Sequence, residues 1–185
     1  IFWGIFMLIS LMGGAKGLQQ LLSRQFEGFA TNSGFLGANK TSKAYKGFQQ
    51  GRYWDLENKD VERVRKQVNE LETVTATLAK WGINAIYNEN KISGTLKGLY
   101  PEYQKIEEPN IVFGRFINDI DIRDQRKVCV IGKRIYESLF PGGEDPCGKF
   151  IEVNGIYYRI IGVSMAVGNI SIQGQSETSV VIPFT

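Results

Sequence analysis

The chain has 185 residues, and its 22 Lys and Arg against 19 Asp and Glu leave a formal net charge of +3. So small a net charge argues against a dedicated nucleic-acid-binding protein and against a disordered tail. The sequence contains no histidine, which excludes Ser-His and Cys-His nucleophile pairs and zinc sites that contain histidine.

The N-terminal segment, IFWGIFMLISLMGGA, carries no charge before Lys16. Because a membrane-spanning helix needs about 20 apolar residues, this segment predicts either the outer part of a span or the core of a signal peptide. A helical pattern of apolar residues continues beyond it, at Leu18, Leu21, Leu22, Phe26 and Phe29. That continuity favours the span. We therefore expect residues 1–29 to form a helix that crosses the membrane and extends outward, with residues from 17 onward outside the cytoplasm.

Residues 31–54 lose the helical period, and their mixture of apolar, Thr and aromatic residues between glycines predicts a strand or a bent hairpin. No acidic residue lies between Glu27 and Asp55, and four cationic residues alternate with aromatic ones. The residues of this strip are Lys40, Lys43, Tyr45, Lys46, Phe48, Arg52, Tyr53 and Trp54. Such a strip can bind single-stranded nucleic acid or contact lipid headgroups. Because the whole chain is barely basic, we favour a solvated strand near the membrane whose aromatic side chains pack inward, and we expect no nucleic-acid partner.

The middle of the chain predicts one helix and three strands. An amphipathic helix follows Asn58, its expected N-cap, and its apolar stripe consists of Val61, Val64, Val68 and Leu71. Three strands are expected within residues 73–100, the last two joined by a turn at 88–90. Pro101 then begins a short helix of at most two turns.

The C-terminal part alternates strands with a helix. Residues 128–131 form an unbroken apolar run, which predicts a strand buried on both faces. Residues 133–140 predict a helix, and residues 149–163 a hairpin around Asn154-Gly155. The last strand, 179–185, contains Pro183, which indicates the edge of a sheet or the end of a strand.

The segment GEDPCGKF at 143–150 resembles a phosphate-binding loop, in which Gly, four residues, Gly and Lys precede Ser or Thr. Gly143, Gly148 and Lys149 fit, but Phe150 stands where Ser or Thr would hold magnesium. Pro146 removes one backbone donor, and a helix enters the loop where a strand should. We therefore predict a structural turn that binds no nucleotide.

The remaining candidate sites favour structural interpretations. Asp119, Asp121 and Asp124 resemble the start of a calcium loop but lack its Gly and closing Glu, so we interpret them as a solvated turn. Cys129 and Cys147 match no known metal spacing, and we expect free thiols rather than a disulfide. A carboxylate-based hydrolase would need two acids facing each other across a cleft, and nothing in the sequence pairs them. We predict no catalytic, cofactor-binding or metal-binding residue, and no enzyme activity.

A series of short motifs runs through the second half of the chain. They are Gly-Arg-Phe at 114–116, Val-Ile-Gly at 130–132, Leu-Phe at 139–140, Asp-Pro-Cys-Gly-Lys at 145–149, Ile-Gly-Val at 161–163 and Ile-Pro at 182–183. This order resembles the extracytoplasmic core domain of MacB-type (FtsX-like) ABC transporter permeases. The first half fits that family more loosely, and both cysteines stand where small or aliphatic residues are usual in it.

The resemblance implies an α+β fold: a membrane-tethered extracytoplasmic domain with a porter-like βαβ subdomain and an inserted, small mixed α/β subdomain. It implies a location in the inner membrane, with the folded part in the periplasm. The expected parts are residues 1–29 for the membrane helix and its outward extension, 30–98 for the first part of the porter-like subdomain, 99–178 for the insertion, and 179–185 for a return strand.

The resemblance also implies a role without catalysis or cofactors, the relay of ATP-driven conformational change across the inner membrane. The implied partners are an ATP-binding subunit or domain elsewhere, a second permease copy, a periplasmic adaptor, an outer-membrane duct and the lipid bilayer. Some relatives instead release lipoproteins or control cell-wall hydrolases. The alternative outside this family is a secreted or membrane-anchored ligand-binding module.

Overall fold

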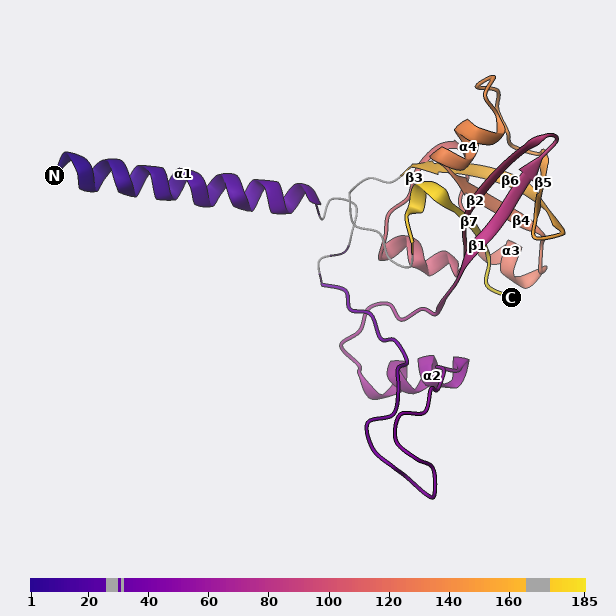
Figure 1. Cartoon of the computed structure of the whole chain (residues 1–185), viewed down its shortest axis with the longest axis horizontal. Coiled ribbons are helices and arrows are strands. Elements are labelled where there is room, and N and C mark those ends of the chain that lie inside the picture. Colours follow the sequence, from indigo (N-terminus) through magenta and orange to yellow (C-terminus); the bar gives the residue numbers. More distant parts are fainter. Residues whose placement is uncertain (26–29, 31, 166–173) are drawn as a thin grey trace. The chain divides into compact units, whose positions relative to one another are not determined.

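The computed structural model describes residues 1–25, 30, 32–165 and 174–185, and contacts group the chain into two units (Figure 1). The first unit comprises residues 1–31 and 77–185, and the second comprises residues 32–76. One mixed sheet with a few short helices dominates the first unit, which confirms the predicted α+β class.

The N-terminal helix, α1 (Phe2–Gln25), runs without interruption through the uncharged segment and past Lys16. The prediction of one continuous helix is confirmed as far as Gln25, and Phe26 and Phe29 lie outside the described residues. Among the helices of the described residues, none has both the length and the apolar character that a membrane crossing requires, so the structure does not bear out the predicted span.

The strands of the first unit form one sheet in the order β3-β6-β4-β7-β2-β1-β5. They are β1 (Thr77–Tyr87), β2 (Asn90–Leu99), β3 (Asn110–Gly114), β4 (Val128–Gly132), β5 (Phe150–Val153), β6 (Ile156–Met165) and β7 (Ser179–Pro183). Because β5 also pairs with β6, the pairings from β6 through β4, β7, β2, β1 and β5 return to β6. Strands β2 and β7 are parallel, as are β4 and β6, and the other pairs are antiparallel.

Two tight turns position the hairpins, and both were predicted. Asn88, with a φ of 52°, begins the turn between β1 and β2, and Asn154 and Gly155, with φ of 50° and 84°, join β5 to β6. Strand β1 is one strand where two were expected. A bulge between Trp81 and Ile83 lets it bend without losing its pairing with β2.

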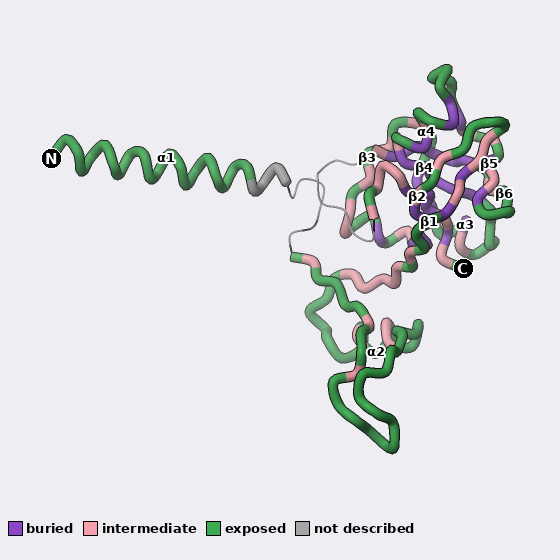
Figure 2. Tube along the Cα trace, in the orientation of Figure 1, coloured by how far each residue is buried: buried purple, intermediate pink, exposed green. Residues whose placement is uncertain are grey.

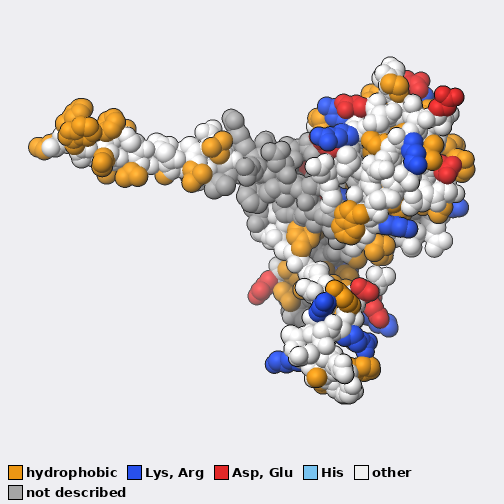
Figure 3. Space-filling model, viewed as in Figure 1, with side chains coloured by type: hydrophobic (Ala, Val, Ile, Leu, Met, Phe, Trp, Pro, Cys, Tyr) orange, Lys and Arg blue, Asp and Glu red, His pale blue; other side chains and the backbone are white. Residues whose placement is uncertain are grey.

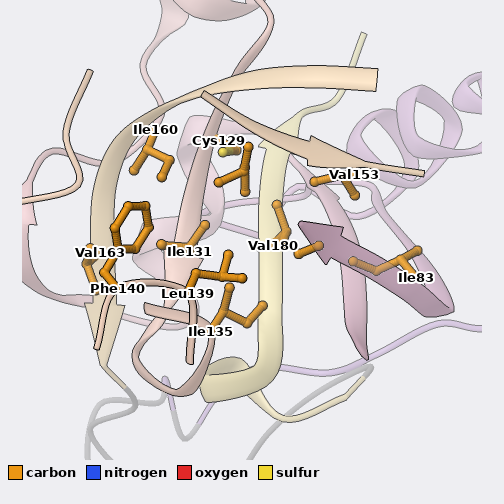
Figure 4. Close-up of a cluster of buried hydrophobic side chains, with 12 residues drawn as sticks. Ile83, Cys129, Ile131, Ile135, Leu139, Phe140, Val153, Ile160, Val163 and Val180 are labelled. Carbon is orange, nitrogen blue, oxygen red and sulfur yellow. The ribbon is translucent and has the colours of Figure 1, made fainter. Parts of the chain in front are cut away.

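Apolar side chains fill both faces of the sheet. One cluster packs β1, β4, β5, β6 and β7 against helix α4 (Lys133–Leu139), with Ile83, Ile131, Ile135, Ile160 and Val180 at its centre (Figure 4). The opposite face packs against the short 3-10 helix η1 (Pro101–Lys105) and the chain around residues 116–117. Burying a side chain such as Ile or Val contributes about 1.5–3 kcal/mol each.

Strand β4 shows why its sequence is apolar at every position. Cys129 and Ile131 enter the first cluster, and Val128 and Val130 enter the opposite one. Each residue of β4 is therefore buried (Figure 2), and the predicted doubly buried strand is confirmed. The predicted helix that follows is confirmed as α4, and the short helix at Pro101 as η1.

Several elements differ from expectation. Strand β3 and helix α3 (Asp119–Arg123) were not predicted. Strand β7 lies between β4 and β2 rather than at an edge, and Pro183 is its last residue. A proline at that position ends the strand without removing a hydrogen bond from its middle, so only the interpretation of Pro183 as a strand end is confirmed.

The two contact units do not test the boundaries expected from the resemblance at residues 98 and 178, because they separate residues 32–76 from the rest. Strands β1 and β2, which lie mostly within 30–98, pair in one sheet with β5 and β7. Residues 32–76 instead form a unit by themselves. The expected division into a porter-like subdomain, 30–98 with the return strand 179–185, and an insertion, 99–178, stays a prediction.

The second unit contains helix α2 (Asn58–Gln67) and an irregular hairpin before it. The N-cap of α2 is Glu57 rather than Asn58, because the carboxylate of Asp60 accepts a hydrogen bond from the backbone N–H of Glu57 at 2.9 Å. The helix ends at Gln67, since Val68 is extended. The last two residues of the predicted apolar stripe, Val68 and Leu71, therefore lie beyond the helix.

Candidate functional site

A lysine lies buried in the middle of the sheet. Lys97 of β2 is 3% exposed, and its neighbours in the sheet are Ala79 of β1 and Val181 of β7. Its pairing register places it on the same face of the sheet as Leu99, two residues later, which packs with Tyr103 of η1. A lysine in such surroundings loses most of its hydration, which makes the charged form costly.

Glu107 is the acidic residue that acts electrostatically on this lysine, and its carboxylate links two other elements. The hydroxyl of Tyr103 donates to Glu107 Oε2 at 2.9 Å, and the hydroxyl of Ser176 donates to Glu107 Oε1 at 2.7 Å. Ser176 belongs to a second 3-10 helix, η2 (Ser176–Thr178), whose Glu177 pairs with Arg134 of α4 at 3.0 Å. Glu107 thus fastens η2 to η1 across a sequence separation of 69 residues.

The surroundings shift the pKa values of both Lys97 and Tyr103. Burial lowers the pKa of Lys97, and the attraction of Glu107 opposes that shift only in part. Burial and the neighbouring Glu107 together raise the pKa of the Tyr103 hydroxyl, so Tyr103 remains a proton donor to the carboxylate. Charged Lys97 therefore costs folding free energy.

Replacing Lys97 with Met should raise the free energy of unfolding at neutral pH, by about 1 kcal/mol, because an apolar side chain of similar length removes the cost of burying the charge. The sign follows from linkage. A lysine with a lowered pKa in the folded chain destabilises it below that pKa, and the penalty disappears as pH rises toward the unfolded value of about 10.4. Urea unfolding across this pH range measures both effects. The control is the exposed Lys80 of β1, changed to Met; a Lys97→Met protein less stable than this control would contradict the assignment.

A second polar cluster surrounds Asp121, which is fully buried. The guanidinium of Arg115 donates to both oxygens of the Asp121 carboxylate, at 2.6 and 3.0 Å, and the backbone N–H of Asn118 donates at 3.1 Å. Arg126 lies 3.8 Å from the same carboxylate. Burial would raise the pKa of Asp121, but the hydrogen bonds from Arg115 and Asn118 outweigh burial and lower it.

This arrangement corrects the interpretation of the acidic stretch as a solvated turn. Asp121 is the third residue of α3 and forms a reciprocal capping pair with Asn118, whose side chain accepts from the Asp121 backbone N–H at 3.0 Å. Asp119 is exposed, and Asp124 pairs with Arg123 at 2.9 Å. Among the described residues no group of His, Cys, Asp or Glu could hold a metal ion.

The loop that resembles a phosphate-binding segment lies between α4 and β5, so a helix enters it and a strand leaves it, as predicted. The ammonium of Lys149 pairs with the carboxylate of Glu144 and lies 5.3 Å from the ring centre of Phe140. The carboxylate of Asp145 accepts the backbone N–H of Cys147 at 2.8 Å. These contacts engage Lys149 and one loop N–H within the protein itself, which fits the interpretation of a structural turn.

The two cysteines are free thiols, as predicted. Cys129 is buried in β4, and burial raises its pKa. Burial, followed by the neighbouring Asp145, raises the pKa of Cys147 to about 11. Neither thiol therefore forms the reactive thiolate at neutral pH.

The cationic strip is where the structure contradicts the preferred interpretation of the sequence. Its aromatic side chains do not pack inward: Tyr45, Phe48, Tyr53 and Trp54 are 70%, 60%, 72% and 45% exposed. The reason is that the second unit offers little interior, since α2 has no buried residue. The strip is an exposed surface.

Comparison with known proteins places the chain in a family. The sequence model of the MacB-like periplasmic core domain matches residues 1–185. The macrolide export ATP-binding/permease protein MacB of Wolinella succinogenes is 31% identical over 64% of this chain and 18% of its own length. The protein of the same description from Chlorobium phaeobacteroides is 25% identical over 100% of this chain and 28% of its own length. The chain thus spans less than a third of these relatives.

A solved structure agrees with the sequence match. The periplasmic region of MacB from Actinobacillus actinomycetemcomitans superposes with a TM-score of 0.62 at 19% identity, covering 86% of this chain and 68% of that one. At that identity the likeness supports the fold, and the family match over the whole chain supplies the assignment. The chain is therefore a member of the MacB-like periplasmic core domain family, the periplasmic domain of an ABC transporter permease.

Proposed function

We propose that this domain is a mechanical relay, which carries ATP-driven conformational change from the inner membrane to the periplasmic face of the transporter. The proposal rests on the continuity of α1. This helix runs for 24 residues without a break, from an uncharged end to Gln25. At 1.5 Å per residue this helix is about 36 Å long. A continuous helix passes a displacement at one end to the other, because it moves as a unit rather than bending at a joint.

The chain after α1 is fastened to the sheet-bearing part of the same unit. The backbone N–H of Ala30 donates to the carbonyl oxygen of Ile106 at 2.9 Å. Ile106 directly follows η1 and precedes Glu107, whose carboxylate fastens η2. These hydrogen bonds support a route by which movement of the chain beyond α1 reaches η1 and η2, next to the sheet.

The proposed partners follow from the transporter class. The curated relatives are ATP-binding and permease proteins in one chain, so the ATPase of this transporter lies on another segment or another subunit. A second permease copy forms the dimer, a periplasmic adaptor and an outer-membrane duct complete the export path, and the uncharged turns of α1 contact the bilayer.

The relay is tested by interrupting α1 in the full-length transporter. A flexible Gly-Ser segment inserted between Lys16 and Leu18 should leave ATP hydrolysis intact and abolish transport. A seven-residue Ala/Glu/Lys insert at the same position is the matched control, because seven residues add two helical turns within about 20° and keep the helix stiff. That insert should retain most of the transport.

The outcome that would overturn the relay is transport at the wild-type rate with both inserts, since a flexible joint would then pass on as much motion as a helix. The domain would in that case be a passive docking module. Transport lost with both inserts and ATP hydrolysis lost as well would show that α1 is needed for assembly rather than for coupling.

A further inference from the structure

The exposed hairpin of the second unit, which we call the basic arm (residues 40–54), has a defined backbone. The N–H of Thr41 donates to the carbonyl of Arg52 at 2.9 Å, and the N–H of Gly51 donates to the carbonyl of Thr41 at 2.8 Å. Tyr45 and Phe48 exchange two backbone hydrogen bonds of 3.2 and 3.0 Å near the tip. The arm is therefore held by backbone bonds rather than by an apolar core.

The cationic and aromatic side chains of the basic arm share one surface. Lys40 Nζ lies 4.9 Å from the ring centre of Tyr53, and the guanidinium of Arg52 lies 4.4 Å from that of Phe48. Figure 3 shows blue Lys and Arg side chains and orange apolar side chains together on this unit. Because no Asp or Glu lies between residues 28 and 54, this surface has four positive charges and no internal countercharge.

We propose that the basic arm docks on an anionic phospholipid surface. Lys and Arg near such a surface each contribute about a fivefold factor in affinity, and Tyr and Trp settle at the level of the headgroups, where one end of the ring is apolar and the other wet. Both kinds of side chain are exposed in the arm. The domain belongs to a periplasmic family of a membrane transporter, so a lipid surface is its constant neighbour, whereas nucleic acid is not.

The length of the connecting chain permits this contact. Residues 16–25 of α1 extend about 15 Å beyond the uncharged segment, at 1.5 Å per residue. The fourteen residues between Gln25 and Lys40 can cover at most about 50 Å when extended. If the uncharged turns of α1 contact the bilayer, as proposed above, the basic arm can reach the same membrane. This inference rests on the proposed contact of α1 with the bilayer but not on the relay, because an arm at the membrane is compatible with a passive or a moving domain.

Hydrogen exchange of the full-length protein in lipid nanodiscs tests the proposal. One set of discs contains phosphatidylcholine alone, and the other contains equal parts phosphatidylcholine and phosphatidylglycerol. Amides of residues 40–54 should exchange about tenfold more slowly in the anionic discs. The slowing should disappear at about 0.5 M salt, where the Debye length falls to roughly 4 Å.

Two charge-reversal variants make the result specific. Lys40→Glu, Lys43→Glu and Lys46→Glu together should abolish the slowing, while the same change at Lys80, Lys91 and Lys127, which are exposed lysines of the first unit, should preserve it. Equal protection in both kinds of disc would mean that protein covers the arm, either a second copy or another part of the polypeptide. Equally fast exchange in both would mean that nothing covers it. Either result overturns the proposal.

Discussion

Replacing Asp121 with Asn should lower the free energy of unfolding by about 3 kcal/mol. Removing one member of a buried ion pair costs about 3–5 kcal/mol, because the remaining charge loses its partner. The lower end of that range applies here, since the Arg115 side chain is 43% exposed and can be hydrated again. Urea unfolding followed by circular dichroism measures the loss.

The stabilisation that Asp121 contributes should decrease in acid. Hydrogen bonds from Arg115 and Asn118 hold the pKa of Asp121 below its usual value in the folded chain despite burial. Such a group contributes stability that is present above the unfolded pKa, about 3.9, and is lost as pH falls through the folded pKa. The difference between wild type and Asp121→Asn should therefore be full at neutral pH and shrink in acid below about pH 4.

Asp119 provides the matched control for this prediction. It lies two residues earlier in α3 and is exposed, so Asp119→Asn should change the free energy of unfolding by less than about 0.5 kcal/mol. Equal losses in the two variants would show that the acidic stretch acts through general charge rather than through the Arg115–Asp121 pair.

The features that the sequence predicted well are those with a local cause. The Asn154-Gly155 turn is confirmed because these two residues adopt positive φ at little cost. The apolar run at Val128–Ile131 predicted a strand buried on both faces, and the two apolar clusters on opposite sides of β4 confirm it. In each case a few adjacent residues contain the whole physical reason for the structure.

The features that escaped prediction depend on residues far apart in the chain. The central place of β7 follows from its pairing with β2 and β4, which no local pattern reveals. Lys97 is buried at the centre of a sheet assembled from distant strands, and the acid that acts on it, Glu107, joins η1 to η2. A lysine in an alternating strand is ordinarily interpreted as solvent-facing, so nothing in β2 itself marked Lys97 as buried.

Asp121 is an intermediate case, because one local signal was present. Asn118 followed three residues later by Asp121 fits the reciprocal capping pattern at a helix start, and that pattern would have predicted α3. The spacing of Asp119, Asp121 and Asp124 resembled a calcium loop, and because that loop was incomplete we predicted a solvated turn instead. The partner of the buried Asp121 carboxylate is Arg115, the arginine of the Gly-Arg-Phe motif. The pair therefore accounts both for the arginine of the motif and for the attachment of α3, the helix that was not predicted.

The glycine of the same motif leads to the second large effect. Gly114 ends β3 with a φ of 71°, and a Cβ atom there would collide with the carbonyl oxygen of Ile161 and lie 2.8 Å from Cys147 Sγ. Changing Gly114 to Ala should therefore combine backbone strain with overpacking and lower the free energy of unfolding by about 3–5 kcal/mol. Because Arg115 follows directly, the collision should also displace the partner of Asp121.

Gly143 separates the two causes in this prediction. Its φ of 70° matches that of Gly114, but an added Cβ would meet nothing within 4 Å. Gly143→Ala should thus cost only the strain of a left-handed alanine, about 1–2 kcal/mol. Thermal unfolding of the two variants, measured together, should show a clearly larger fall in Tm for Gly114→Ala. Equal falls would mean that the close approach of β3 to β6 at Ile161 is relieved by a small shift of the strands, and that Gly114 is required for its backbone conformation alone.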